Sequence, residues 1–299
     1  MHAAVGRDGL RRFSYLVAVL MVAGSTGVMG CTAHVGEAND LRHRSAIAAS
    51  TATPSLQEAT SHGTTKLALS IEGRAAEIAK SDPHRGRCVR NMVEIEGRFC
   101  IDKYEASLVD VLPGGEEKVR SPFGMVGDAR VKAVSEPDVF PQGYISANEA
   151  ARACSASGKR LCRVQEWKRA CAGPEKRAYG YGDQREPGRC NDRGRSPVIA
   201  RYGFRFTPQT MNDGSLNQLE HTLAKSGAHA GCTNGYGVYD MVGNLHEWVA
   251  DPGGTFYGGY YQDVSSRGHG EGCGYATTAH DARYHDYSTG FRCCSDLPR

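Results

Sequence analysis

The chain has 299 residues, 40% of them hydrophobic and 23% charged, which is enough apolar material to bury one good core or two small ones. The formal net charge is +3, and basic residues are interspersed with acidic ones instead of forming a stripe. Protein surfaces that bind nucleic acid need clustered Lys and Arg, so the composition predicts no nucleic-acid partner.

Residues 1–30 have the pattern of an export signal, in which a basic start precedes the apolar run FSYLVAVLMVAGSTGVMG. The small residue before Cys31 is similar to the cleavage box of bacterial lipoproteins, so we expect lipidation of Cys31, with an ordinary signal peptide as the alternative. Thr32, in place of Asp, favours the outer membrane, facing the periplasm or the surface. The sequence thus predicts an exported protein that a lipid anchors in the cell envelope.

Residues 31–85 are rich in Ala, Ser, Thr and His and poor in aromatics. This composition lacks the apolar content that offsets the entropy of ordering, and it predicts a flexible tether. Residues 86–299 are expected to form one folded domain of ordinary size. Gly and Tyr dominate its second half, which favours short strands and long ordered loops over packed helices.

Cysteine use agrees with export. Of the 11 cysteines, ten remain once Cys31 is set aside, and this even number predicts oxidised pairs. No C-x-x-C pair occurs, and the cysteines are spread from Cys88 to Cys294, so a zinc site is not expected. Cys88 and Cys100 bracket two strand-like runs around Gly97, which indicates a hairpin closed by a disulfide.

Two helices can be predicted farther along the chain. Ser146 and Glu149 form a capping box, and the helix that follows should run to Ala156 and stop at Gly158. The second helix is VQEWKRACA, which Gly173 and Pro174 close. Its apolar face is formed by Trp167, Ala170 and Cys171.

Five motifs in the folded part resemble one known family. They are GKRLCRVQEWKRACAG, YGYGD, GVYDMVGNLHEW, FYGGYY and STGFRCC, in this order. They look like the formylglycine-generating enzymes, also called sulfatase-modifying factors, over essentially the whole stretch from Cys88 to Cys294. The resemblance implies an α+β, C-type-lectin-like sulfatase-modifying-factor fold that is low in regular secondary structure and rich in disulfides.

Enzymes of this family hold copper(I) with two cysteines, five residues apart, that follow a Gly-Gly-Ser motif. Counting from Gly258 and Gly259, the resemblance places Asp263 and Gly268 at the two cysteine positions. Neither residue supplies the thiolate that copper(I) prefers. We therefore expect no copper and no active copper-dependent formylglycine-generating oxidase.

The resemblance also implies two disulfide pairs, Cys154–Cys293 and Cys171–Cys273. Cys293 and Cys294 are adjacent in an apparent terminal strand, so their side chains should point to opposite faces and need different partners. Cys232 is our candidate partner for Cys294. The two cysteines then left over are expected to pair as Cys162–Cys190.

The stretch GVYDMVGNLHEW places two acids around a tight Gly243–Asn244 turn. Calcium prefers carboxylate and carbonyl oxygens, and such a turn can aim carbonyls at the point that two acids share. The matching positions bind calcium in the enzymes that the chain resembles. Carried over residue by residue, the expected structural calcium ligands are Asp240, Gly243, Leu245 and Glu247. The alternative is a turn in which Glu247 makes an ordinary hydrogen bond or ion pair.

His246 alternates with these positions and should point the other way, towards a tyrosine-rich loop face. His280 and His285, each followed by Asp, add imidazoles beside carboxylates, a combination that can form a metal or acid/base site or a loop of mutual hydrogen bonds. The expected ligand-binding face comprises Tyr257, Tyr260, Tyr261, His280 and His285.

Two functions remain open from the sequence. The first is a calcium-stabilised binding or assembly module of the cell envelope that holds a glycan, a peptide or an envelope protein, since tyrosines give large contact area at small entropy cost. The second is a metal-dependent oxidoreductase, or another protein- or metabolite-modifying enzyme, with His246, His280 and His285 as the catalytic candidates. We expect binding rather than catalysis.

Overall fold

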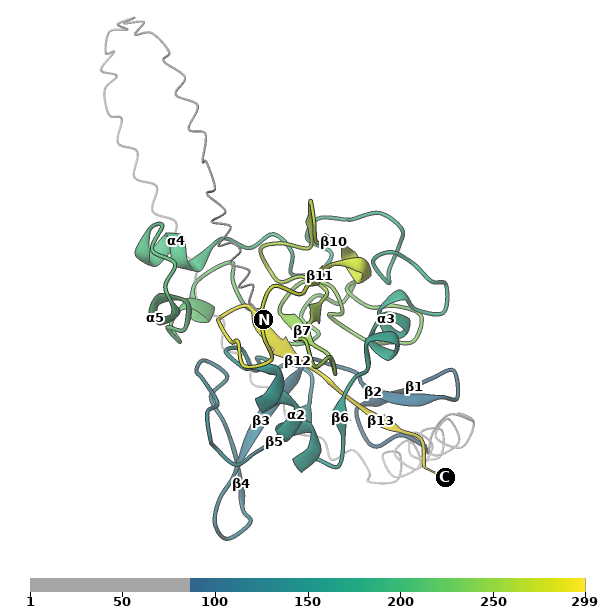
Figure 1. Cartoon of the computed structure of the whole chain (residues 1–299). Helices are drawn as coiled ribbons and strands as arrows, with labels where there is room; N and C mark the ends of the chain where they lie inside the picture. The colour runs from purple at the N-terminus through teal and green to yellow at the C-terminus, as the bar shows by residue number, and fades with distance from the viewer. Residues whose placement is uncertain (1–86, 299) are drawn as a thin grey trace, which may run out of the picture. The chain divides into compact units, whose positions relative to one another are not determined.

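The computed structural model describes residues 87–298 (Figure 1). The expected signal peptide, the lipidation site at Cys31 and the expected tether over residues 31–85 lie outside the described residues. Within residues 87–298, no helix is both long and apolar enough to cross a membrane.

Regular structure is short and mixed, and the expected α+β fold is confirmed. The helices are α2 (Ala147–Ala156), α3 (Val164–Ala172), α4 (Pro197–Tyr202) and α5 (Pro208–Met211), with 3₁₀ turns at Leu216–Gln218 and Gly272–Gly274. The strands are β1 (Met92–Ile95), β2 (Phe99–Asp102), β3 (Ala106–Val111), β4 (Glu117–Val119), β5 (Val131–Ser135), β6 (Arg160–Leu161), β7 (His246–Trp248), β8 (Phe256–Tyr257), β9 (Ser265–Ser266), β10 (Gly270–Glu271), β11 (Ala276–Thr277), β12 (Thr289–Phe291) and β13 (Cys293–Asp296).

The strands form four small sheets. Their orders are β1-β2-β13-β6, β4-β3-β5, β11-β8-β7-β12 and the two-stranded β10-β9. The third sheet positions the candidate site: β7 pairs with β8 antiparallel and with β12 parallel, so segments about forty residues apart in the chain meet there. Figure 1 shows β7 and β12 side by side near the centre of the drawn domain.

The elements predicted from local patterns are confirmed. At the start of α2, Ser146 Oγ accepts a hydrogen bond from Glu149 N at 3.3 Å, and Glu149 Oε2 accepts one from Ser146 N at 2.8 Å. Gly158 has a φ of 69°, the left-handed conformation expected after a helix end. The three residues predicted for the apolar face of α3 are all buried.

All ten cysteines between residues 87 and 298 are joined in disulfides. Three pairs are as expected: Cys88–Cys100, Cys154–Cys293 and Cys171–Cys273. The other two expectations, Cys162–Cys190 and Cys232–Cys294, are wrong. The structure has Cys162–Cys294 and Cys190–Cys232 instead.

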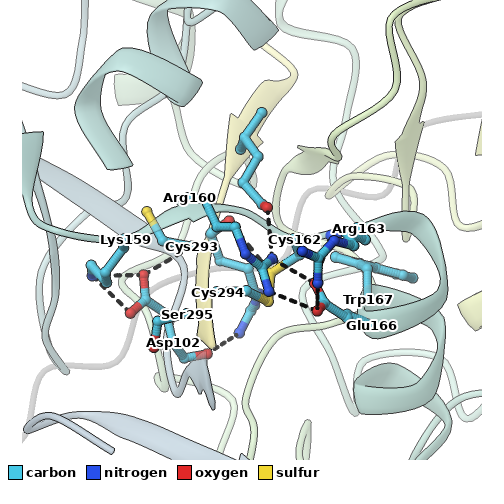
Figure 2. The surroundings of a disulfide bond; sticks show 12 residues. Asp102, Lys159, Arg160, Cys162, Arg163, Glu166, Trp167, Cys293, Cys294 and Ser295 are labelled. Atoms are coloured by element: carbon cyan, nitrogen blue, oxygen red, sulfur yellow. Dashed lines mark hydrogen bonds and ion pairs between the residues drawn. A yellow bond between two sulfur atoms is a disulfide. The ribbon is translucent and has the colours of Figure 1, made fainter. Parts of the chain in front are cut away.

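Sheet topology explains the first correction. β13 lies between β2 and β6 and pairs Cys294 with Arg160, which brings Cys294 beside Cys162, the residue after β6 (Figure 2). The two Cα atoms are 4.8 Å apart. Cys293 faces the opposite side and reaches Cys154 in α2, as alternation along a strand requires.

A loop contact explains the second correction. Arg189 Nε donates a hydrogen bond to the carbonyl oxygen of Gly231 at 2.9 Å, so the residue after each of them, Cys190 and Cys232, is brought to the same place. Their Cα atoms lie 4.7 Å apart. Cys190 and Cys232 thus cross-link two long loops, a contact that no local sequence pattern records.

Three apolar clusters make up the core. Trp167 of α3 belongs to the first, Trp248 of β7 to the second, which also includes residues of α2, and Tyr261 to the third, which also includes residues of α4. The five disulfides and the three clusters all close within residues 87–298. This part of the chain therefore contains an apolar core and the disulfides that stabilise it.

Candidate functional site

A layer of aromatic rings covers one face of β7 and β8. His246 begins β7, and alternation along the strand directs it away from Glu247. Centroid to centroid, its ring lies 4.5 Å from Phe256, 4.8 Å from Tyr260 and 5.6 Å from Tyr275. His246 therefore points towards the aromatic loops, as predicted.

Two further histidines extend this layer at its ends. His269 stacks on Tyr275 with ring centroids 5.4 Å apart, and its Nδ1 lies 3.0 Å from the carbonyl oxygen of Ala276. His280 stacks on Tyr284 at 3.7 Å and lies 5.9 Å from Phe256. We call this set the histidine layer: His269, Tyr275, His246, Phe256, His280 and Tyr284 in order, with Tyr260 beside His246.

The histidine layer has a buried floor and a partly exposed rim. His246, Phe256 and Tyr275 form the floor and are each no more than 5% exposed. The rim consists of His269, His280, Tyr260 and Tyr284, which are partly exposed. A ligand would therefore meet the rim first and reach His246 only through it.

One polar atom of the floor lacks a partner. Nδ1 of His246 is buried and makes no hydrogen bond with any residue that the structure describes. Burial lowers the pKa of His246 to about 3, and the neighbouring charges of His269 and His280 add to this effect. His246 is therefore a neutral imidazole at physiological pH. Its free nitrogen can donate or accept one hydrogen bond, depending on the tautomer.

Three residues predicted for the ligand-binding face lie elsewhere. Tyr257 points to the opposite side of β8 and stacks on Trp167 in the core, with ring centroids 5.3 Å apart. Tyr261 is fully buried. Both tyrosines belong to the apolar core and not to the expected ligand-binding face. His285 lies outside the histidine layer, with Nδ1 2.8 Å from Asn212 Oδ1.

Several members of the layer were not found by sequence reasoning. Phe256 could have been predicted from the sequence. Side chains alternate between the two faces of a strand, so Phe256 and its neighbour Tyr257 point to opposite faces, and Phe256 lies on the same face of the sheet as His246. His269 could not have been predicted, because it lies in an irregular Gly-rich stretch without hydrophobic periodicity.

The turn predicted to bind calcium has an uncommon backbone. φ is positive at Asp240 (55°), Gly243 (80°) and Asn244 (59°), a conformation that costs about 1 kcal/mol or more at a residue other than Gly. A Cβ at position 243 would clash with the carbonyl oxygen of Asn191, so this position requires glycine. Such concentrated strain is typical of ligand and metal turns.

Glu247, on the other face of β7, makes a buried ion pair with Arg292. The guanidinium donates to Oε1 and to Oε2, each at 2.6 Å, and Trp167 Nε1 donates to Oε2 at 2.7 Å. The alternative expected for Glu247, an ion-pair role, is thus present in the structure. Each carboxylate oxygen has two acceptor positions, so Oε1 retains one.

Glu105, which the sequence did not single out, joins this group. Its Oε1 accepts from Leu245 N at 3.1 Å and its Oε2 from Asn244 Nδ2 at 2.5 Å. Burial raises the pKa of Glu105 well above its usual range, and repulsion from Asp240 and Glu247 adds to this. No local pattern could have found Glu105, because its partners lie about 140 residues away in the chain.

Three buried carboxyl groups therefore act on the charge of Arg292: Glu247, Glu105 and Asp240. Burial raises the pKa of Asp240 to about 6. When all three carboxyl groups are ionised, their negative charge exceeds the single positive charge of Arg292. This excess favours the binding of an additional cation.

The donor set fits calcium better than a transition metal. Among residues 87–298, no three His, Cys, Asp or Glu side chains meet in a metal-binding arrangement. The expected calcium set instead combines two carboxylates with two carbonyls. The carbonyl oxygens of Gly243 and Leu245 accept no hydrogen bond from the described residues. Oxygen donors of these kinds are what calcium binds.

The two positions expected to replace the copper cysteines lie beside the histidine layer. Asp263 Oδ2 accepts a hydrogen bond from the hydroxyl of Tyr275 at 3.0 Å, and Gly268 lies between β9 and β10 with a φ of 99°. All the described cysteines are in disulfides, so none of them supplies a thiolate here.

These features define a class of protein: a disulfide-rich α+β domain with little regular structure, whose site is built from long loops around a short sheet. The model of the sulfatase-modifying factor enzyme 1-like domain matches residues 64–296. The chain belongs to this family, and the resemblance to the formylglycine-generating enzymes is confirmed.

The chain is similar to both active and inactive relatives. It is 29% identical over 161 residues to a formylglycine-generating enzyme of Streptomyces coelicolor, which covers 52% of this chain and 45% of that protein. It is 33% identical over 122 residues to inactive C-alpha-formylglycine-generating enzyme 2 of Bos taurus, which covers 37% and 33%. The chain thus spans less than half of these relatives, and family membership does not by itself assign an activity.

Two solved structures are similar to parts of this chain at low sequence identity. PvdO from Pseudomonas aeruginosa is 16% identical, with a TM-score of 0.39 over 67% of this chain and 80% of that one. The Major Tropism Determinant P3c variant is 15% identical, with a TM-score of 0.40 over 70% and 53%.

Proposed function

We propose that this chain is an exported, lipid-anchored module of the cell envelope that uses the family fold to bind a ligand. The histidine layer is the observation that carries the proposal. Its partly exposed rim can stack on a sugar ring or a peptide side chain, and the free Nδ1 of His246 offers one polar contact to a group that enters the layer. The ligand class is a glycan, a peptide or an envelope protein.

The proposed function excludes the copper-dependent oxidation. Asp263 and Gly268 stand where the resemblance expects the copper cysteines, and the disulfides leave the described residues without a free thiol to replace them. A carboxylate and a glycine do not stabilise copper(I).

Calcium is part of the same proposal, as a structural ion. Asp240, Glu247 and the carbonyls of Gly243 and Leu245 would hold it. Two observations support this assignment: buried carboxyl groups outnumber the guanidinium of Arg292, and no hydrogen-bond donor within residues 87–298 contacts the two carbonyls. Bound calcium would supply positive charge that balances the acids and fixes the turn below His246.

The enzyme alternative has less support. A shared metal would need His246, His280 and His285 to converge, but Phe256 lies between the first two rings, and His285 is engaged by Asn212. Iron and copper analysis of the purified protein tests this alternative. Stoichiometric metal that is lost in His246→Ala would favour it over binding.

Binding can be tested by NMR with labelled histidines. Soluble peptidoglycan fragments, which combine glycan and peptide, are the probe. We expect them to shift the ring signals of His280 and His269, and we expect His280→Ala and Tyr284→Ala to weaken binding about tenfold or more, since stacking contacts are lost. His285→Ala is the matched control, because it removes a histidine outside the layer. Absence of binding, or equal affinity in all variants, would contradict the proposal.

A further inference from the structure

The segment that carries α4 and α5 exposes apolar side chains that the core does not use. Of the seven large hydrophobic side chains that are exposed in the described part of the chain, three fall within eight residues: Ile199 (41%), Phe204 (85%) and Phe206 (48%). Single exposed apolar residues are common, but a cluster of this kind marks an interaction surface.

The same segment is strongly basic. Between Arg193 and Asn212 the sequence contains four arginines and no Asp or Glu. Arg201 pairs with Asp213 at 3.3 Å, whereas Arg193, Arg195 and Arg205 make no ion pair within residues 87–298. We call residues 193–212 the arginine-phenylalanine arm.

Hydrogen bonds fix the shape of this arm. Ser196 caps α4, and Gly203, with a φ of 63°, ends it. Beyond the bend, Thr210 Oγ1 donates to the carbonyl oxygen of Arg205 at 2.6 Å, and Thr207 caps α5. Phe204 and Phe206 are therefore held outward between two capped helical turns.

The arm is also attached firmly to the core. Val198, Tyr202 and Met211 pack in the third apolar cluster, and the hydroxyl of Tyr202 donates a hydrogen bond to Asp213. Figure 1 shows α4 and α5 together at one side of the drawn domain, away from the β1–β2 hairpin. The two phenylalanines thus project from a rigid base.

We propose that the arginine-phenylalanine arm docks on a membrane surface rich in anionic phospholipid. Phenylalanine side chains enter the boundary between headgroups and acyl chains, and arginines bind lipid phosphates and raise the affinity for anionic lipid. The charge argues for this partner, because a segment with four arginines and no acid complements a uniformly negative surface. The proposal rests neither on lipidation of Cys31 nor on the ligand site.

Vesicle flotation tests the proposal with residues 32–299, produced under oxidising conditions, so that Cys31 and any lipid on it are absent. Vesicles contain phosphatidylcholine alone or phosphatidylcholine and phosphatidylglycerol in equal parts. We expect binding to the anionic vesicles only, and we expect it to weaken as salt is raised, because exposed charges are screened. A Phe204→Trp variant should show blue-shifted emission on these vesicles, since the two native tryptophans are already fully buried.

The variants distinguish insertion of the phenylalanine side chains into the bilayer from electrostatic adsorption of the protein to its surface. Phe204→Ser with Phe206→Ser should lower the partition coefficient at least about tenfold, and Arg195→Gln with Arg205→Gln should also lower it and weaken its salt dependence. The matched control is Val119→Ser, which removes another side chain that is 82% exposed, and it should bind as the wild type does. The proposal would be overturned if the wild type failed to float with anionic vesicles, or if the double-phenylalanine variant bound them equally well. It would also be overturned if the protein were retained by an acidic protein surface and not by vesicles.

Discussion

At the scale of single residues, the two faces of β7 have opposite chemistry. His246 is neutral and surrounded by aromatic rings, whereas Glu247, the next residue, is in a buried charged group with Arg292. Strand alternation is sufficient to separate them. The sequence predicted this separation, but not the partners on either side, since those come from distant loops.

We predict that His246 makes the protein sensitive to acid. In the unfolded chain its imidazole takes up a proton near pH 6.5, whereas burial lowers the folded pKa to about 3. The contribution to stability is complete above the unfolded value and is lost as pH falls between these values. At about pH 5 the loss is about 2 kcal/mol.

Urea unfolding at about pH 7.5 and pH 5, at fixed calcium, measures this effect. His246→Phe should lose less stability on acidification than the wild type, by about 2 kcal/mol. His285→Phe, which removes a histidine outside the layer, should behave as the wild type does. An identical acid response in His246→Phe and wild type would show that His246 is not held neutral.

A second prediction concerns the ion pair of Glu247. Glu247→Gln removes the carboxylate that is hydrogen-bonded to the fully buried guanidinium of Arg292, and should lower the free energy of unfolding by about 3–5 kcal/mol. Asp296→Asn is the matched control, because Asp296 is 70% exposed and pairs with Arg160 at the surface. That change should cost less than about 1 kcal/mol. Similar small losses in both variants would argue against a structural ion pair.

At the scale of elements, local signals predicted local structure. The capping box of α2, the hairpin of β1 and β2, and the apolar face of α3 all depend on residues within a few positions of one another. The partners of Cys162 and Cys190 instead depend on which strand lies beside β13 and on which loops touch. The histidine layer depends likewise on loops that fold together only in the complete domain.

The predicted calcium turn can be tested by thermal melting. We expect a chelator to lower the melting temperature and added calcium to restore it, because a ligand that binds only the folded state stabilises it. Burial raises the pKa of Asp240 to about 6, so protons compete with calcium below that pH, and the calcium effect should be larger at about pH 7.5 than at pH 5.

Asp240→Asn is the variant for this experiment. It keeps the size of the side chain and one oxygen but removes the charge, so its melting temperature should respond less to calcium than that of the wild type. A wild-type curve indifferent to both chelator and calcium would mean that the turn is held by Arg292 and Glu105 alone.

The disulfide pattern gives a prediction for the linked peptides. Digestion of the unreduced protein should release Cys162 linked to Cys294 and Cys190 linked to Cys232. Labelling of the denatured, unreduced domain should find no free thiol. Replacing Cys154 and Cys293 together by Ala should lower stability by roughly 2–5 kcal/mol, the usual range for a native bridge. Peptides that link Cys162 to Cys190 would contradict the structure.

At the scale of the whole molecule, the domain has the family fold, and the resemblance places Asp263 and Gly268 at the positions expected for the copper cysteines. Within residues 87–298, five disulfides and three apolar clusters stabilise a domain with little regular structure. Family motifs in the sequence predicted this fold correctly. They did not predict the histidine layer, because four of its members lie outside the family motifs: His269, Tyr275, His280 and Tyr284.

The most direct test of the central claim is mass spectrometry of a sulfatase-type peptide that contains the cysteine to be converted. The peptide is incubated with the purified protein, copper(I), a reductant and oxygen, and a formylglycine-generating enzyme of Streptomyces coelicolor serves as the positive control. Our account predicts that the mass of the peptide stays unchanged with this protein, because the resemblance places Asp263 and Gly268, which supply no thiolate, at the expected copper positions. A time-dependent conversion of the peptide cysteine to formylglycine would contradict it.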